Sequence, residues 1–329
     1  MVEAAGTPGG LVTLEEIEAA AERIEDTAFH TPLLPFPELS EEWGGEVRLK
    51  CESLQRSGSF KIRGALNFVS QLSREELARG VITYSSGNHA QALALAARLK
   101  GARAVVVMPT TAPDVKVDGA RRLGAEVVFE GTTSLHRQIR AEAIAEKEGL
   151  VVVPPFDHPF IIAGQGTVGL EIAEDWPEVE VVLVPIGGGG LASGTAAALK
   201  SLIPDVRIVG VEAKGAPSMR SALDAGEPLT LDRIDTIADG IASVRVGDLT
   251  FLHARTHLDD VILVEDDAIR EAASLLLSRR KLVVEYSGVV PVAALLSGAL
   301  DGRGGKIVAV LSGGNQDSSA LRDLVGYPS

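Results

Sequence analysis

The sequence predicts an α/β protein with two open parallel sheets and a functional site in the cleft between them. Short runs rich in Val, Ile and Leu alternate with Ala- and Leu-rich windows along most of the chain. The runs are apolar on both faces, which is typical of parallel strands that helices cover on both sides. The length of 329 residues allows about two domains.

Each predicted strand is a short β-branched run that a turn or a helical window follows. The predicted strands are Val47–Lys50, Val81–Tyr84, Ala104–Met108, Val127–Phe129, Val151–Val153, Val181–Val184, Arg207–Val211, Val261–Val264 and Ile307–Leu311. The clearest helices between them are predicted at Asn88–Leu99, Ser134–Glu148, Gly190–Leu202, Asp266–Arg279 and Val289–Leu300. We expect residues 1–79 and 154–329 to form a large domain and residues 80–153 a small one.

Composition and charge limit the kinds of partner. Asp and Glu number 45 and Lys and Arg number 31, so the net charge is −14. Such a chain repels nucleic-acid phosphates and anionic membrane surfaces, so neither is an expected partner. Cys51 is the only cysteine, which excludes an intrachain disulfide, and no targeting segment is visible. Both observations favour the cytoplasm.

Four consecutive glycines, Gly187–Gly190, follow the predicted strand Val181–Val184 and open a helix. Without side chains in the way, their backbone N–H groups can converge on an anion, and the helix N-terminus adds a partial positive charge. The pattern indicates a phosphate-binding loop; the alternative is a flexible turn. Neither G-x-G-x-x-G nor a Walker motif is present here, which argues against a nucleotide.

Lys61 lies among small residues and an aromatic ring in the segment Ser57–Ala65. Taken alone, this segment is typical of a helix start with Ser59 as the N-cap and a solvated lysine. The functional alternative is a Schiff-base amine, which needs partial burial to lower its pKa and leave the amine uncharged.

Two polar motifs follow other strands. Ser85–Gln91 brings hydroxyl, amide and imidazole groups to a helix start, where a carboxylate can be held. Alternatively, this motif only caps the helix. Ser312–Asn315 closes the last predicted strand and is by itself a weak turn signal.

Together and in this order, four motifs resemble those of the fold-type II pyridoxal-phosphate enzymes, whose fold is similar to that of the tryptophan synthase β subunit. The motifs are Ser59-Phe60-Lys61, Ser85-Ser86-Gly87-Asn88-His89, Gly187–Gly190 and Ser312-Gly313-Gly314-Asn315. Ile62–Ala65 is similar to the serine/threonine dehydratase and serine racemase branch. The resemblance implies pyridoxal 5'-phosphate as cofactor and β-elimination of L-threonine or L-serine to a 2-oxo acid and ammonia. It also implies a homodimer or homotetramer.

The resemblance implies a cofactor-binding role for a set of these residues. Lys61 carries the cofactor, and Phe60 packs near its ring. Asn88 contacts the phenolic oxygen, and Ser312 bonds to the pyridine nitrogen. The phosphate is held by Gly187, Gly188, Gly189, Gly190 and the N–H of Leu191.

Catalytic and substrate-binding roles follow in the same way. Lys61 is the base at the substrate Cα. The substrate carboxylate is received by Ser85, Asn88 and His89, and Ser243 lies near the substrate side chain. A divalent cation is implied at Glu212 and the carbonyl of Ala216. Serine at position 218 is a poorer ligand for a hard cation than the family's acidic group, so this site is in doubt.

Other activities stay open because some residues differ from the usual pattern of threonine dehydratases or allow another substrate. Ser86 resembles the second acid–base group of serine racemases, so a serine racemase with dehydratase side activity is an alternative. His136 or Arg137 can recognise a β-carboxylate, as in 3-hydroxyaspartate dehydratases; the alternative for both is an exposed helix face. A cofactor-binding protein without catalysis is disfavoured by Ser85–Gln91. Tyr286 replaces the family's usual proline and is expected to change the wall near the cofactor ring.

Overall fold

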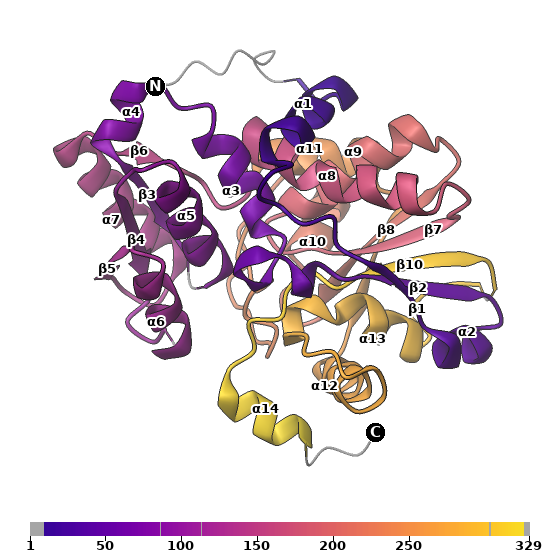
Figure 1. Ribbon diagram of the computed structural model, residues 1–329. Helices are drawn as coiled ribbons and strands as arrows, with labels where there is room; N and C mark the ends of the chain where they lie inside the picture. Colours follow the sequence, from indigo (N-terminus) through magenta and orange to yellow (C-terminus); the bar gives the residue numbers. More distant parts are fainter. Residues whose placement is uncertain (1–9, 86, 113, 303, 326–329) are drawn as a thin grey trace.

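The computed structural model describes residues 10–85, 87–112, 114–302 and 304–325, and two sheets dominate it (Figure 1). The six-stranded sheet has the strand order β1-β2-β10-β7-β8-β9, and the four-stranded sheet has the order β5-β4-β3-β6. The first comprises β1 (Leu33–Pro35), β2 (Glu46–Lys50), β7 (Val181–Pro185), β8 (Arg207–Ala213), β9 (Asp260–Val264) and β10 (Lys306–Val310). The second comprises β3 (Val81–Tyr84), β4 (Ala104–Met108), β5 (Glu126–Phe129) and β6 (Val151–Val152).

The nine predicted strands are confirmed, with ends that differ by at most two residues. One further strand, β1, was not predicted. It is three residues long, ends on Pro35 and pairs antiparallel with β2, with Leu33 opposite Lys50. Proline is tolerated there because β1 is an edge strand. The parallel-sheet prediction therefore holds for every other pair of named strands and is wrong for this edge.

Helices connect and cover the strands. They are α1 (Leu14–Ile24), α2 (Pro37–Trp43), α3 (Lys61–Val69), α4 (Arg74–Arg79), α5 (Asn88–Leu99), α6 (Asp114–Arg122), α7 (Ser134–Glu148), α8 (Pro159–Asp175), α9 (Gly190–Leu202), α10 (Ser218–Ala225), α11 (Asp248–His257), α12 (Asp266–Leu275), α13 (Val290–Leu296) and α14 (Ser318–Val325). Short 3-10 turns lie at Glu52–Leu54, Arg56–Gly58 and Tyr286–Gly288, and a π-turn at Leu276–Arg280. None of the helices in the described ranges is both long and apolar enough to cross a membrane.

Three of the five helices predicted most clearly, α5, α7 and α9, have the predicted bounds. The other two are shorter than predicted. Helix α12 stops at Leu275 and passes into the π-turn. Helix α13 stops at Leu296, shortly before Gly298, whose positive φ of 69° cannot continue a right-handed helix.

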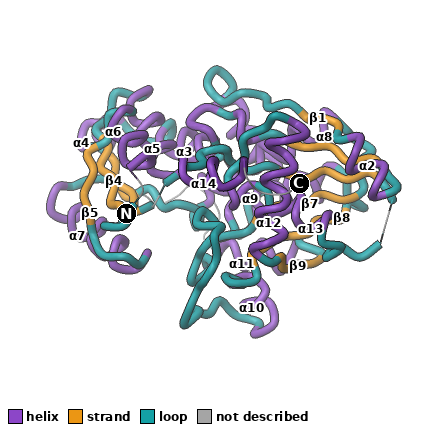
Figure 2. Tube along the Cα trace, turned by 90° about the horizontal axis from the view of Figure 1, so that it is seen from below, coloured by secondary structure: helices purple, strands orange, loops and turns teal. Residues whose placement is uncertain are grey.

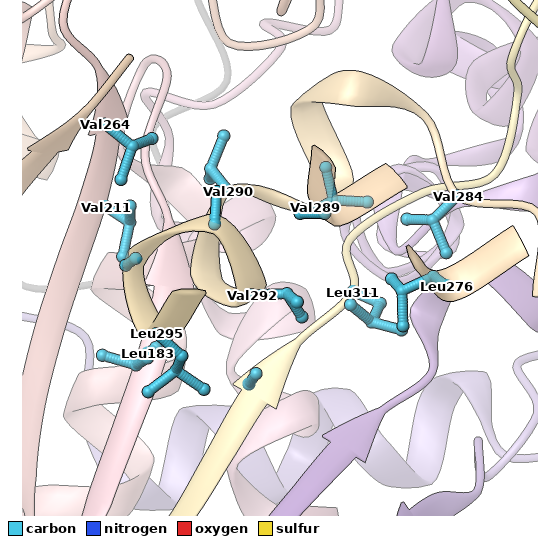
Figure 3. Close-up of a cluster of buried hydrophobic side chains, with 14 of the residues drawn as sticks. Leu183, Val211, Val264, Leu276, Val284, Val289, Val290, Val292, Leu295 and Leu311 are labelled. Atoms are coloured by element: carbon cyan, nitrogen blue, oxygen red, sulfur yellow. The ribbon is translucent and has the colours of Figure 1, made fainter. Parts of the chain in front are cut away.

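Helices cover both faces of the six-stranded sheet because its strands are apolar on both faces. On β7, Val182 and Val184 pack into the cluster with α8 and α9, whereas Leu183 packs into the opposite cluster with α12 and α13. Figure 3 shows the second cluster, where Leu183 lies beside Leu295 of α13. Each central strand residue is therefore buried whichever way it points.

The four-stranded sheet follows the same rule. Val81 and Val106 face the cluster that contains α3 and α5, and Ile82 and Val107 face the cluster that contains α7. Figure 2 shows the strands of the two sheets at opposite ends of the molecule, with helices and loops between them.

The strand orders fix where a ligand can bind. In the large sheet β8 and β9 are added on one side of β7, and β10 on the other. In the small sheet β4 and β5 are added on one side of β3, and β6 on the other. Ligands of open α/β sheets bind outside the carboxyl ends of the strands at such switch points. The loops after β7, β10, β3 and β6 are therefore expected to meet at one site.

Candidate active site

A cavity of about 490 Å³ lies where the loops of the two sheets meet. The loops after β3, β6, β7 and β10 all contribute to its lining. Predicted site residues that line it are Phe60, Lys61, Ser85, Asn88, His89, Gly187, Gly188, Gly189, Gly190, Leu191, Ser243 and Ser312. Residues about 250 positions apart in the sequence are thus brought together, as the strand orders require.

Lys61 is the first residue of α3, and its side chain is partly buried in this cavity. Its Nζ donates a hydrogen bond to the carbonyl of Pro155 at 2.7 Å and lies 5.1 Å from the centre of the Phe60 ring. Burial lowers the pKa of the Lys61 amine to about 8, although the nearby Glu285 carboxylate opposes the shift. At neutral to mildly alkaline pH the amine is therefore uncharged far more often than an exposed lysine.

A buried ion network below α3 holds the helix that carries Lys61. The guanidinium of Arg63 donates from Nε and Nη2 to Glu52 at 2.8 and 2.7 Å, and from Nη1 to Glu171 at 2.6 Å. Lys50 also contacts Glu171, at 2.7 Å, so Glu171 joins Lys50 to Arg63 in this network.

The glycine loop after β7 wraps one wall of the cavity. A Cβ at Gly188 would come within 2.2 Å of the Phe156 ring, so the ring and the loop fit only because position 188 has no side chain. Thr250 donates a hydrogen bond from Oγ1 to the carbonyl of Gly188 at 2.7 Å. This bond fixes the loop with its backbone directed at the cavity, next to the start of α9.

Asp157 connects the loop after β6 to the same region. Its carboxylate accepts hydrogen bonds from the backbone N–H groups of Asp248, Leu249 and Thr250 at 3.0, 3.1 and 3.0 Å. A carboxylate at these N–H groups compensates the positive end of the helix dipole of α11. Asp157 thereby positions Thr250, which in turn holds Gly188.

Asn88 begins α5 and faces Glu285 across the cavity wall. Its Nδ2 donates to Glu285 Oε1 at 2.5 Å. Glu285 is 2% exposed, and its other oxygen, Oε2, has no hydrogen-bond partner among the described residues. Burial raises the pKa of the Glu285 carboxyl to about 7; the Lys116 ammonium lowers it and the Asp239 carboxylate raises it further.

Lys116 and Asp239 form an ion pair that joins the two sheet units at the cavity. Lys116 belongs to α6, beside the small sheet, and Asp239 belongs to the loop between α10 and α11. Both residues line the cavity, and the Lys116 ammonium is also close enough to influence Glu285. The pair therefore places one charge of each sign at the cavity wall.

The residues predicted to receive the substrate carboxylate lie at the start of α5. Ser85 Oγ accepts a hydrogen bond from the Gly87 N–H at 3.3 Å. His89 is buried, its Nε2 lies 3.3 Å from the Val153 carbonyl, and burial lowers its pKa to about 3. His89 is therefore a neutral imidazole at physiological pH. Ser86 lies outside the described residues.

The structure bears on two expectations about the cavity wall. Of His136 and Arg137, it is Arg137 that lines the cavity. Arg137 is 9% exposed; its Nη1 donates to the Thr132 carbonyl at 3.3 Å, and its Nε has no hydrogen-bond partner among the described residues. Tyr286 packs against the core of the large sheet, and its neighbours Glu285 and Ser287 line the cavity in its place, so its effect on the wall stays a prediction.

At the predicted metal site, the oxygens of Glu212 and Ala216 accept hydrogen bonds from the protein itself. Glu212 accepts hydrogen bonds from the backbone N–H groups of Met219 and Arg220 at 2.7 and 2.9 Å and from Ser218 Oγ at 3.3 Å. The Ala216 carbonyl accepts the Ser218 N–H at 3.0 Å. A cation would have to share these oxygens with four donors. In the described ranges no three His, Cys, Asp or Glu residues are grouped for metal binding.

Phe156, Asp157 and Glu285 were not assigned a role from the sequence. Phe156 and Asp157 follow the predicted strand Val151–Val153 directly, so the rule that ligands bind beyond strand ends could have found them. Glu285 follows no strand, and no local signal marks it.

Comparisons with known proteins agree with this geometry. Residues 24–313 match the family described as "Pyridoxal-phosphate dependent enzyme". L-threonine ammonia-lyase of Thermotoga maritima is 45% identical over 96% of this chain and 78% of that protein. Maize serine racemase has a similar structure, with a TM-score of 0.91 and 37% identity over 96% of this chain and 97% of that one. A pyridoxal 5'-phosphate-dependent aspartate racemase has a TM-score of 0.85 and 34% identity over 94% and 97%.

The predicted resemblance, the fold type and the cofactor are confirmed by these matches, because they cover nearly the whole chain and include the segments that line the cavity. The chain belongs to the family of pyridoxal-phosphate dependent enzymes.

Proposed function

We propose that this protein removes the hydroxyl and amino groups of L-threonine or L-serine and releases a 2-oxo acid and ammonia. One observation carries the proposal: the Lys61 amine, with its pKa lowered to about 8, shares a cavity with the glycine loop and the start of α5. The similarity to a threonine ammonia-lyase over 96% of the chain supports the choice of reaction.

The residues of the cavity fit pyridoxal phosphate. The loop Gly187–Gly190 leaves backbone N–H groups uncovered at the start of α9, where a phosphate is favoured by the helix dipole. Lys61 would hold the cofactor covalently, Phe60 would pack near its ring, and Ser312 would bond to the ring nitrogen. When bound, the cofactor supplies a sink for the electrons released at the substrate Cα.

The protein's own residues then bind the amino acid and move its proton. Ser85, Asn88 and His89 at the start of α5 receive the carboxylate, because a helix N-terminus favours an anion. Lys61 takes the proton from Cα, and a base with a pKa near 8 is suited to this at neutral to mildly alkaline pH. Ser243 lies beside the substrate side chain.

A second substrate class is favoured by Arg137. Its buried guanidinium faces the cavity without a carboxylate partner among the described residues. A buried unpaired charge is costly, and a second substrate carboxylate would compensate it. A 3-hydroxyaspartate would supply that group, and the similar structure of an aspartate racemase supports a dicarboxylic substrate.

A substrate panel with one matched pair of variants tests both substrate classes. We expect the purified protein to release a 2-oxo acid from L-threonine or L-serine. Arg137→Met should lower kcat/KM for 3-hydroxyaspartate by about 100-fold, because one or two hydrogen bonds to a charged group are lost. It should change kcat/KM for L-threonine by less than about three-fold. Arg137→Lys retains the charge as control. Release of no 2-oxo acid from any member of the panel would contradict the proposed function.

A racemase activity is the alternative function, favoured by the similar structure of maize serine racemase. Protonation of Cα from the second face needs a second acid–base group, and we propose Ser86 for it from its place in the sequence motif. We expect the wild type to interconvert L- and D-serine slowly and Ser86→Ala to abolish this exchange while sparing elimination from the L-substrate. Chiral chromatography measures both; exchange that is equal in the variant would exclude Ser86.

We also propose the domain boundaries and setting that the sequence suggests. Strands β3 to β6 lie within residues 81–152 and the other strands outside them, which supports a small domain of residues 80–153. The single cysteine, Cys51, is buried and free, which suits a reducing cytoplasm. From the resemblance we also propose a homodimer or homotetramer. The same resemblance is the basis for proposing a divalent cation at Glu212 and Ala216.

A further inference from the structure

The side chain of Asn315 joins the loop after β10 to two segments that lead to the cavity, the turn before Lys61 and the start of α5. It follows β10, and its Nδ2 donates to the carbonyl of Ser57 at 2.8 Å and to Oδ1 of Asn88 at 2.9 Å. An amide nitrogen has two hydrogens, so both are used. The orientation of the Asn315 amide is therefore fixed by two acceptors on different segments.

The first of these segments is the turn at Ser57 and Gly58, which leads to Lys61. Ser57 and Gly58 both have positive φ, 60° and 74°, and only four positions separate Ser57 from Lys61. A Cβ at Gly58 would come within 2.3 Å of Asn315 Oδ1, so the turn and the amide fit closely together. The backbone N–H of Gly314 also donates to the Gly58 carbonyl, at 2.8 Å. The turn before Lys61 is thus held by the loop after β10.

The second contact sets the orientation of the Asn88 amide. Its Oδ1 accepts from Asn315, and its Nδ2 donates to Glu285 Oε1 at 2.5 Å. Both ends of the amide are therefore defined, and one hydrogen on Nδ2 is left for another acceptor. Asn88 lines the cavity, so this hydrogen is available to a bound molecule.

We propose that Asn315 and Glu285 are positioning residues, which fix the Asn88 amide so that its remaining N–H is directed at the phenolic oxygen of the bound cofactor. The inference rests on the proposed placement of the cofactor ring beside Asn88. Through Ser57, Asn315 also anchors the turn before Lys61. One side chain therefore sets both the covalent attachment point and the donor to the ring.

The charge on the phenolic oxygen gives a direct measure of this role. A donated hydrogen bond stabilises the ionised form of an oxygen and lowers its pKa. The colour of the lysine-bound cofactor depends on this ionisation, so loss of the N–H should raise the midpoint of the colour change with pH. The charged groups near Glu285 are Lys61 on α3, Lys116 on α6 and Asp239 on the loop before α11, and all are retained in the variants below.

The experiment compares variants of the full-length holoenzyme in two backgrounds, wild type and Asn88→Ala. In the wild-type background, Asn315→Ala should raise the midpoint by about one pH unit, which corresponds to the loss of one hydrogen bond to a charged oxygen. Asn315→Asp should raise it further, because a carboxylate would face two acceptors. Glu285→Gln keeps an acceptor for the Asn88 amide, so it should shift the midpoint less than Glu285→Met does. In the Asn88→Ala background none of these changes should add a shift.

Asn67→Ala is the matched control. Asn67 is another asparagine, buried on α3, and its side chain bonds to Phe160 and Arg23 away from Asn88. This variant should lower the melting temperature without moving the midpoint. Dissociation of the cofactor, followed by titration of the apo-protein, gives a second readout besides activity: Asn315→Ala should weaken cofactor affinity about ten-fold.

Three results would overturn the inference. A shift from Asn315→Ala that persists in the Asn88→Ala background, or that Asn67→Ala matches, would make the effect general and structural. If Asn88→Ala shifts the midpoint and Asn315→Ala and Glu285→Met do not, the positioning role alone fails. If Asn88→Ala itself causes no shift, the placement of the ring fails and the inference with it. If Asn315→Ala does not fold, the two Glu285 variants give the same test. Glu285→Met should shift the midpoint more than the conservative Glu285→Gln, and neither should shift it in the Asn88→Ala background.

Discussion

Replacing Lys61 with alanine is expected to lower kcat/KM for elimination at least about 10⁴-fold, because the variant loses both the covalent attachment of the cofactor and the base at Cα. The purified wild-type protein should be yellow and the variant should not. Lys100→Ala is a suitable control, since Lys100 is an exposed lysine at the end of α5.

Chemical labelling identifies the lysine directly. Borohydride reduction should fix the cofactor to Lys61, and peptide mapping shows where it is attached. Label on Lys50 or Lys116 would contradict the assignment. Both form ion pairs, Lys50 with Glu171 and Lys116 with Asp239. Against the effect of burial, the Asp239 carboxylate raises the pKa of Lys116 and so favours its unreactive ammonium.

The pH dependence of cofactor attachment follows from the same burial. Because burial lowers the pKa of Lys61 from 10.5 to about 8, the amine is mostly protonated below pH 8 and mostly free above it. The rate at which the apo-protein binds the cofactor covalently should therefore rise with pH and level off above about pH 8. A rate that keeps rising beyond pH 10 would show a lysine with an ordinary pKa.

Gly188→Asp is expected to weaken cofactor binding by about 10³-fold. The new carboxylate would lie beside the phosphate, and two unit charges about 4 Å apart near a protein surface repel by roughly 4 kcal/mol. Its Cβ would also meet the Phe156 ring at 2.2 Å. Gly188→Ala adds the steric conflict without the charge, so it should weaken binding by only about 10- to 100-fold. Titration of the apo-protein with cofactor measures both.

Gly226→Asp is the control for the substitution in the glycine loop Gly187–Gly190. Gly226 ends α10 with a positive φ of 80°, and a Cβ there would meet nothing within 4 Å. Asp is strained in this conformation, so the variant should lose some stability and keep its cofactor affinity. Unchanged affinity in Gly188→Asp would show that the anion binds elsewhere.

Local patterns in the sequence determined most of the secondary structure. The bounds of α5, α7 and α9 agree with the prediction. In α7 the local reason is visible, because the Thr133 side chain caps its start and Gly149, with a positive φ of 71°, ends it. The glycine run was recognisable from its own sequence as a phosphate-binding loop. The Lys61 segment alone was typical of a helix start with a solvated lysine, and only its combination with the other three motifs indicated the cofactor.

The same local reasoning failed where a position depends on a distant partner. Strand β1 has little strand signal of its own and exists because it pairs with β2. The choice between His136 and Arg137 depends on which side of α7 faces the cavity. That side is set by the packing of α7 on the small sheet, where Ile144 is buried against Val107.

The sequence by itself therefore determined the fold class, the alternation of strands and helices, and the candidate chemistry at Lys61 and Gly187–Gly190. Only the tertiary structure decided that Phe156 closes over Gly188, that Glu285 and Asn315 hold Asn88, and that Lys116 meets Asp239. These contacts join residues 32 to 227 positions apart. Strand order and register bring them together through burial of the whole sheets, and no local periodicity encodes which two distant side chains will then lie opposite each other.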